Sequence, residues 1–286
     1  MTDNKGVKYS MAPKIKHAKG VLIISLLILV MSAYCAVQGF MDDSLYGNVI
    51  ETGVFKMAYM AGTVAQDMIT ITASAAMVIL ITLYCKSKDI RFFISIIGLL
   101  SFYFYAYGVY VISALYTSLY IVYVIIFTLS MIGMILGISG FTGEKVERLL
   151  LLKWIRITSG ALLLLIVCVF VPMWIVSMVP YTQNHTIPDF YAVFILDLCI
   201  VMPFFIAVIY MLIRDFKVSY IYLGIALLKT FTLILSVLIG EITFPAHGFE
   251  IDMAMIVVYG TITVISLLLL VFYFAGLKYS SGSNKT

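Results

Sequence analysis

Long apolar runs separated by short polar segments dominate the chain. A helix needs about 20 predominantly apolar residues to cross the hydrocarbon core of a bilayer, and eight runs are long enough. They are Gly20–Phe40, Val64–Cys85, Phe92–Ser113, Leu119–Gly140, Ile157–Val179, Phe190–Ile213, Ser219–Gly240 and Met253–Leu277. The pattern predicts an all-α polytopic transmembrane helical bundle. We expect one transmembrane domain over residues 20–277, between a basic tail at 1–19 and a short tail at 278–286. The longest connection, residues 41–63, has room for a small interfacial helix.

The basic residues fall on one side of this pattern. Except for Lys56 and Lys229, every lysine and arginine lies in one of the two tails or in the second, fourth or sixth connection. Cytoplasmic loops carry the excess of basic residues, so both termini are expected in the cytoplasm (N-in/C-in). The first run could instead be a cleaved signal peptide, but it exceeds the usual apolar length of about 7–15 residues. We expect a multi-pass protein of a cell membrane, of the bacterial cytoplasmic type.

The composition agrees with lipid as the main partner. Of the 286 residues, 63% are hydrophobic and 11% charged, and the mean hydropathy is +1.12, whereas soluble domains carry about 25% charged residues. The net charge of +4 is spread over short loops, so a nucleic-acid partner is not expected. The four cysteines form no C-x-x-C pair, and no histidine lies in a span. No metal, cofactor or enzyme motif is therefore expected.

Two charged residues lie deep inside predicted spans. Counted from the outer end of each span, Asp197 lies about eight residues into span six and Lys229 about eleven residues into span seven. A charge at the middle of a bilayer costs about 2.5–3.5 kcal/mol on insertion scales. Because consecutive spans are antiparallel neighbours, we expect an Asp197–Lys229 ion pair. The pair can be structural or functional, and the sequence leaves both interpretations open.

Other polar residues line up near these charges. The hydroxyl residues Thr232 and Ser236 follow Lys229 on one helix face, and a similar polar stripe that includes Asp67 begins span two. Tyr103 and Tyr107 lie deep in span three, where they need hydrogen-bond partners. The candidate ligand-binding or ion-pair residues are Asp67, Tyr103, Tyr107, Asp197, Lys229, Thr232 and Ser236. We predict a polar, aromatic cavity in the outer half, lined by spans two, three, six and seven. The alternative is that these groups serve helix packing and the interfacial belt.

The two halves of four spans resemble one another. Span two begins with Gln66-Asp67 and span six contains Asp197, so both spans carry an aspartate. Basic residues follow the end of both spans. The next span reads Gly98–Tyr103 in the first half and Gly224–Lys229 in the second. Both halves begin on the same side, so a duplication would give two parallel four-helix repeats, an arrangement that occurs in transporters.

The same residues carry a resemblance to a known group of proteins. Gln66-Asp67, the cluster from Tyr103 to Tyr107, and Asp197-Leu198 followed by Pro203 resemble a family of uncharacterised bacterial polytopic integral membrane proteins. The resemblance covers residues 64–135 and 187–240. The chain departs from the family near Ala75-Ala76, where a proline is expected. The resemblance implies the fold and the polar positions, and no activity.

Three functions remain open at this stage. The intramembrane charges favour small-molecule or ion-coupled transport, because such charges usually mark a functional site. A membrane sensor or accessory subunit that binds an outer ligand or a protein partner is the alternative. An intramembrane lipid-modifying enzyme using Asp67, Asp197 or Glu241 is the third, although no nucleophile and base are recognisable.

Overall fold

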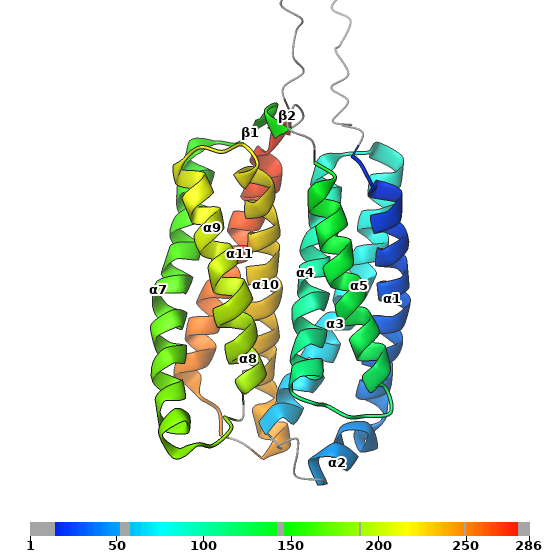
Figure 1. The fold of residues 1–286 in the computed structure, drawn as a ribbon, viewed down its shortest axis with the longest axis vertical. Helices are drawn as coiled ribbons and strands as arrows, with labels where there is room; N and C mark the ends of the chain where they lie inside the picture. The colour runs from blue at the N-terminus through cyan, green and yellow to red at the C-terminus, as the bar shows by residue number, and fades with distance from the viewer. Residues whose placement is uncertain (1–14, 52–57, 142–145, 189, 249, 280–286) are drawn as a thin grey trace, which may run out of the picture.

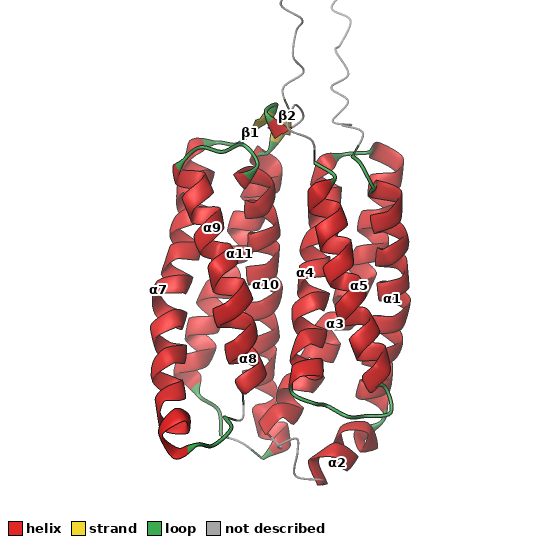
Figure 2. Cartoon of the chain, in the orientation of Figure 1, coloured by secondary structure: helices red, strands yellow, loops and turns green. Residues whose placement is uncertain are grey.

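The computed structural model describes residues 15–51, 58–141, 146–188, 190–248 and 250–279. It confirms an all-α bundle with eight helices long and apolar enough to cross a membrane (Figures 1 and 2). The long helices are α1 (Ala18–Met41), α3 (Ala58–Ser87), α4 (Ile90–Ile112), α5 (Tyr120–Ser139), α7 (Lys153–Asn184), α10 (Ser219–Thr243) and α11 (Met253–Gly276). The sixth span is continuous from α8 (Tyr191–Leu196) through η1 (Asp197–Val201) to α9 (Met202–Ile213). The shorter elements are α2 (Asp43–Glu51), η2 (Phe244–His247), β1 (Leu149–Leu150) and β2 (Lys278–Tyr279).

Each predicted apolar run coincides with one of these helices. The largest difference is at α7, which begins at Lys153, ends at Asn184 and contains Pro172 and Pro180. Its 32 residues give a length of about 48 Å at a rise of about 1.5 Å per residue, which exceeds the hydrocarbon thickness. Helix α2 occupies the long connection after span one, as predicted for an interfacial helix.

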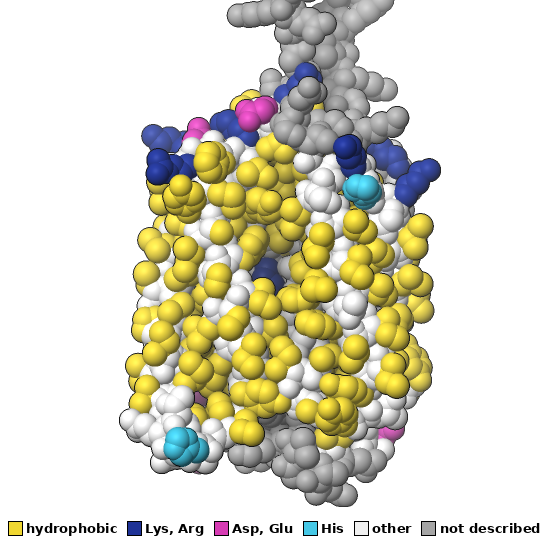
Figure 3. All heavy atoms as spheres, viewed as in Figure 1, with side chains coloured by type: hydrophobic (Ala, Val, Ile, Leu, Met, Phe, Trp, Pro, Cys, Tyr) yellow, Lys and Arg dark blue, Asp and Glu magenta, His cyan; other side chains and the backbone are white. Residues whose placement is uncertain are grey.

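The two ends of the bundle differ in charge. Lysines and arginines gather at one end of the molecule, the upper end in Figure 3, which we call the basic end; Lys86, Arg91, Arg156 and Arg214 lie there. The opposite end, with α2 and η2, is the far end. Lys5, Lys8, Lys14, Lys56, Lys145 and Lys285 lie outside the described residues. The positive-inside rule predicts that the basic end faces the cytoplasm.

The helices form two groups of four, separated in Figure 1. In the first group α1 packs on α3 and α5, and α4 packs on α3 and α5. In the second group α7 packs on α9 and α11, and α10 packs on α9 and α11. Each helix of the first group thus has a counterpart four spans later, and the counterpart packs on the helices that correspond to the neighbours of the first. This pattern is the one that two parallel repeats would give.

Helices α4 and α10 join the two groups. They are the two most buried of the eight spans, and they pack against each other. At their contact a side chain on Gly98 would meet the Leu228 side chain at 2.5 Å, so glycine allows the close approach. The second contact between the groups is α3 with α10, and its counterpart is α8 with α4.

Candidate functional site

Asp197 lies at an irregular turn of the sixth span. Pro203 has no backbone N–H, so the carbonyl of Cys199 cannot receive the usual α-helical hydrogen bond. Residues Asp197–Val201 form a π-helix, and the Met202 N–H donates to the Asp197 carbonyl. A single π turn inside an α-helix is uncommon and often marks a functional site. A proline in the middle of a span indicates a missing backbone hydrogen bond, but the wider turn could not be predicted from the sequence.

The Asp197 carboxylate is buried with only one oxygen bonded. Its side chain is 4% exposed, and the Trp174 Nε1–H donates to Oδ2 at 2.9 Å. Oδ1 has no hydrogen-bond partner in the described part of the chain. An unpaired buried carboxylate oxygen is costly, so this atom is the natural contact for a bound cation or proton.

A cavity of about 340 Å³ extends from Asp197 toward the far end. We call it the Asp197 cavity. It lies between the two helix groups and is bordered by α3, α4, α7, α8, α10 and α11. Its aromatic lining is Tyr105, Tyr110, Phe170, Trp174, Phe190, Phe244 and Tyr259. Its charged lining residues are two acids, Asp197 and Glu241, and no lysine or arginine is among the residues that line it.

The divergence of two helices creates this space. Spans six and seven pack together through α9 and α10, near the basic end. Farther along, α8 packs chiefly against α4, so α8 and α10 separate and the cavity fills the gap. Spans two, three, six and seven line it, where the sequence placed a cavity, and spans five and eight line it too.

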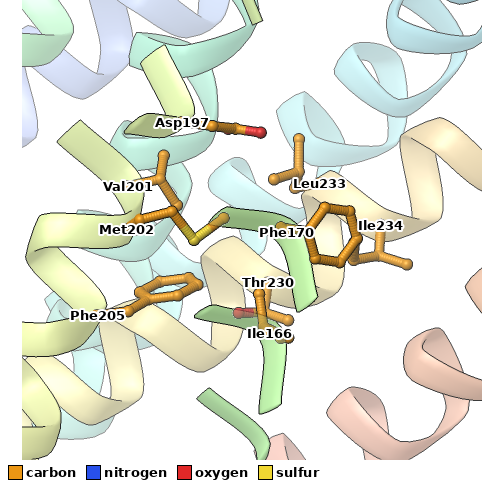
Figure 4. A pocket seen from close by; sticks show the side chains of 9 residues that line it. All are labelled: Ile166, Phe170, Asp197, Val201, Met202, Phe205, Thr230, Leu233 and Ile234. Carbon is orange, nitrogen blue, oxygen red and sulfur yellow. The ribbon is translucent and has the colours of Figure 1, made fainter. Parts of the chain in front are cut away.

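Toward the basic end, the space beyond Asp197 narrows to a cavity of about 20 Å³. Figure 4 shows Asp197 on one side of it and Thr230 and Ile166 on the other. The rest of its lining is apolar, with Phe170, Val201, Met202, Phe205, Leu233 and Ile234. A volume of this size holds about one water molecule. The bundle is therefore closely packed around this small space, just beyond Asp197.

The predicted Asp197–Lys229 ion pair is wrong as a direct contact. Among the described residues, no salt bridge joins the two side chains, although they interact electrostatically. Tyr105 of α4 interacts with both: the Lys229 Nζ lies 3.5 Å from the centre of its ring, and its hydroxyl interacts with the carboxylate. The prediction failed because α8 packs on α4 rather than on α10 at this depth.

Asp67, Tyr103 and Tyr107 lie away from Asp197, inside the first helix group. The Tyr46 hydroxyl donates to Asp67 Oδ2 at 2.6 Å, and the Tyr110 hydroxyl to Oδ1 at 3.3 Å. The Tyr103 hydroxyl bonds the Ser74 hydroxyl at 3.0 Å, and Tyr107 donates to a backbone carbonyl of α1. These bonds tie α1, α2, α3 and α4 together. Burial raises the pKa of Tyr46, which lies in α2, well above its usual range.

The other predicted residues, Ser236, Thr232 and Lys229, do not share one site. Ser236 lines the Asp197 cavity, and Thr232 bonds backbone carbonyls of its own helix. Lys229 lines a different cavity. Sequence reasoning missed Trp174 and Tyr105, which touch the charged groups directly. Trp174 is one of two tryptophans in the chain, and that rarity was the only signal available for it.

Comparison of the chain with family models, with curated proteins and with solved structures gives no match. In the residues that the structure describes, no group of three or more His, Cys, Asp or Glu side chains could hold a metal ion.

Proposed function

We propose that the protein is a multi-span membrane permease that binds a small organic cation in the Asp197 cavity. The observation that carries the proposal is the free Asp197 oxygen at the base of a cavity lined by aromatic rings. Ligand pockets have volumes of about 300–1,000 Å³ and combine apolar walls with a few polar groups. The cavity of about 340 Å³ is within this range.

The charge and the rings of the lining both favour a cation. Asp197 and Glu241 are the charged residues of the lining, both acids, and Asp252 lies near enough to Glu241 to interact with it electrostatically. Aromatic faces attract quaternary ammonium groups, with about 2 kcal/mol or more when the site is desolvated. Trp174 holds the carboxylate in place by its indole N–H. A cation of the size of choline would meet rings on several sides and Asp197 at the base.

Transport requires that the cavity open alternately at the two ends. We assign the described state to the half of that cycle in which the large cavity extends from Asp197 toward the far end, with only a small space beyond Asp197 on the other side. The π turn at Asp197–Val201 provides a local backbone irregularity that could accommodate a change between states. A coupling proton would compete with the cation for the same Asp197 oxygen.

Intrinsic fluorescence can test binding, because one of the two tryptophans lies in the cavity. Trp154 lies near the basic end, against Phe272, so Trp154→Phe leaves Trp174 as the only tryptophan, which can be excited selectively over the 20 tyrosines. We expect tetramethylammonium and choline to change Trp174 emission saturably. The neutral analogue 3,3-dimethyl-1-butanol should bind at least tenfold more weakly, and Asp197→Asn should weaken choline binding at least tenfold. Equal binding of the neutral analogue would contradict a cation site.

Uptake into liposomes distinguishes a permease from the alternative. Radiolabelled choline should enter vesicles that contain the protein faster than protein-free vesicles, and Asp197→Asn should abolish the difference. The close packing just beyond Asp197 favours one second candidate, a sensor that binds the cation from the far end without passing it. Saturable binding without uptake would support the sensor and reject the permease.

A further inference from the structure

Lys229 lines a second cavity, on the other side of Tyr105 from Asp197. This cavity, the Lys229 cavity, has a volume of about 230 Å³ and lies between α4, α5, α8, η1, α9 and α10. Its lining is apolar except for Ser101, Tyr105 and Lys229. The Ser101 hydroxyl already donates to the Gly98 carbonyl of its own helix. Lys229 is the one charged residue among those that line this space.

The Lys229 ammonium lacks a hydrogen-bond acceptor. The side chain is 4% exposed, and within the described segments its Nζ has no hydrogen-bond partner. The Tyr105 ring covers one side of the ammonium. An ammonium has three donors, and a buried unsatisfied charged group is costly. The site thus favours an occupant that brings an oxygen acceptor, preferably a negative one.

The Lys229 cavity opens toward the lipid rather than toward either end of the bundle. Three of its lining residues are exposed on the surface of the helices: Met131 is 40% exposed, Ile135 59% and Ile200 40%. Figure 3 shows Lys or Arg atoms in a hollow at mid-height between the two helix groups, and Lys229 is the one basic residue of the described chain at mid-span. A ligand can enter sideways from the bilayer.

We propose that the Lys229 cavity binds a long-chain fatty acid, with its carboxyl group on Lys229 and its chain along the apolar walls. Lys229 lies ten residues from the start of α10, which is about 15 Å and places it near the middle of the bilayer. A phospholipid keeps its phosphate at the membrane surface, about 15 Å from the middle. A protonated fatty acid is neutral and can sink to this depth. If Lys229 is an uncharged amine, the fatty acid transfers its proton to it and becomes a carboxylate. If the fatty acid enters as the anion, it meets the ammonium directly. In both cases a carboxylate pairs with the Lys229 ammonium.

This site is separate from the proposed cation site, and it can exist whether or not the protein transports cations. The Lys229 cavity and the Asp197 cavity share Tyr105 as a lining residue, and their charged residues differ. Their ligands have opposite charge and enter from different directions. Variants can therefore address one site without removing a charged group from the other.

Native mass spectrometry of the full chain, purified in a neutral detergent and incubated with oleate, tests the proposal. We expect one oleate to be retained, and Lys229→Met to lower the retained fraction at least tenfold, whereas Lys229→Arg should keep most of it. Oleyl alcohol has the same chain without the negative charge and should be retained at least tenfold less. Equal retention of the alcohol, or undiminished oleate binding in Lys229→Met, would overturn the proposal.

A matched pair of variants covers the case in which Lys229→Met fails to fold. Ile135→Trp places a large ring at the lipid-facing mouth and leaves the buried core intact, and it should lower oleate retention at least tenfold. Ile132 is 38% exposed on the same helix but does not line the cavity, so Ile132→Trp should bind oleate as the parent does. Equal loss in both variants, or retention of phosphatidylglycerol in place of oleate, would refute the fatty-acid site.

Discussion

Both oxygens of the Asp67 carboxylate accept hydrogen bonds, from Tyr46 and Tyr110, whereas Asp197 has one oxygen without a donor in the described chain. The two residues are equally buried, at 1% and 4% exposure. A buried carboxylate with filled acceptor positions serves the fold, because it fixes the groups that donate to it. A carboxylate with an unbonded oxygen can accept a further bond, and this difference in bonding is the reason that we propose Asp197 rather than Asp67 as the ligand contact.

The contrast predicts that Asp67→Leu destabilises the protein. The substitution leaves the buried Tyr46 hydroxyl without its acceptor, at a cost of about 1–3 kcal/mol. It also removes one of the two acceptors near the Tyr110 hydroxyl, which lies 3.3 Å from the Thr63 carbonyl as well. Thermal unfolding in detergent should show a clearly lower midpoint. Asp42→Asn is the control, because Asp42 is exposed and bonds only Ser44, and its midpoint should stay near the parent's. An unchanged midpoint for Asp67→Leu would contradict a structural role.

Single residues could be predicted from the sequence where their cost in lipid alone marks them. Asp197 and Lys229 stood out because a bilayer rejects isolated charges. Their partners were not predictable, since Tyr105 and Trp174 are ordinary aromatic residues in apolar helices. The packing of α4 and of α7 against the sixth span brings them to the charges. Tyr103 and Tyr107 were predicted to line a cavity with Asp197 because they lie too deep for the interfacial belt and need hydrogen-bond partners. They face the first helix group instead.

Among the elements, the sixth span has the least regular backbone. Its π turn precedes Pro203, and the Met202 N–H bonds the Asp197 carbonyl across five residues. A π turn adds about one residue to a helical turn, which rotates the side chains before it by about 100° relative to those after it. This rotation sets the direction of Asp197 relative to α9, which packs on α7 and α10.

Pro203→Ala tests the importance of this turn. With an N–H restored at position 203, the segment can return to a regular α-helix, and Asp197 would turn away from the cavity. We expect choline binding to fall at least tenfold while the protein remains folded, with a change in Trp174 emission as its bond to Asp197 breaks. Pro172→Ala in α7 is the control and should preserve binding, because Pro172 is exposed and does not line the cavity. Unchanged binding in Pro203→Ala would show that the turn is dispensable.

At the scale of the whole molecule, the number and order of the spans followed from the sequence, because hydropathy and loop charge act along the chain. How the two helix groups pack against each other could be seen only in the structure. The same neighbours recur four spans later, yet the corresponding polar residues differ: in the aligned stretches Tyr103 bonds a serine of its own group, and Lys229 faces a cavity between groups. The shared packing gives the bundle its shape, and the differences between the halves place both cavities at their junction.

The orientation of the bundle determines which compartment would supply the proposed cation, and it can be measured in intact cells. The four native cysteines are first replaced by alanine, and a single cysteine is introduced at Asn184 near the far end or at Ser87 near the basic end, both of which are exposed. Because the basic residues of the loops should remain in the cytoplasm, a membrane-impermeant maleimide should label Asn184→Cys in intact cells. Ser87→Cys should react only after the membrane is permeabilised. Labelling of Ser87→Cys alone in intact cells would reverse the orientation, and the Asp197 cavity would then extend toward the cytoplasm and receive its cation from there.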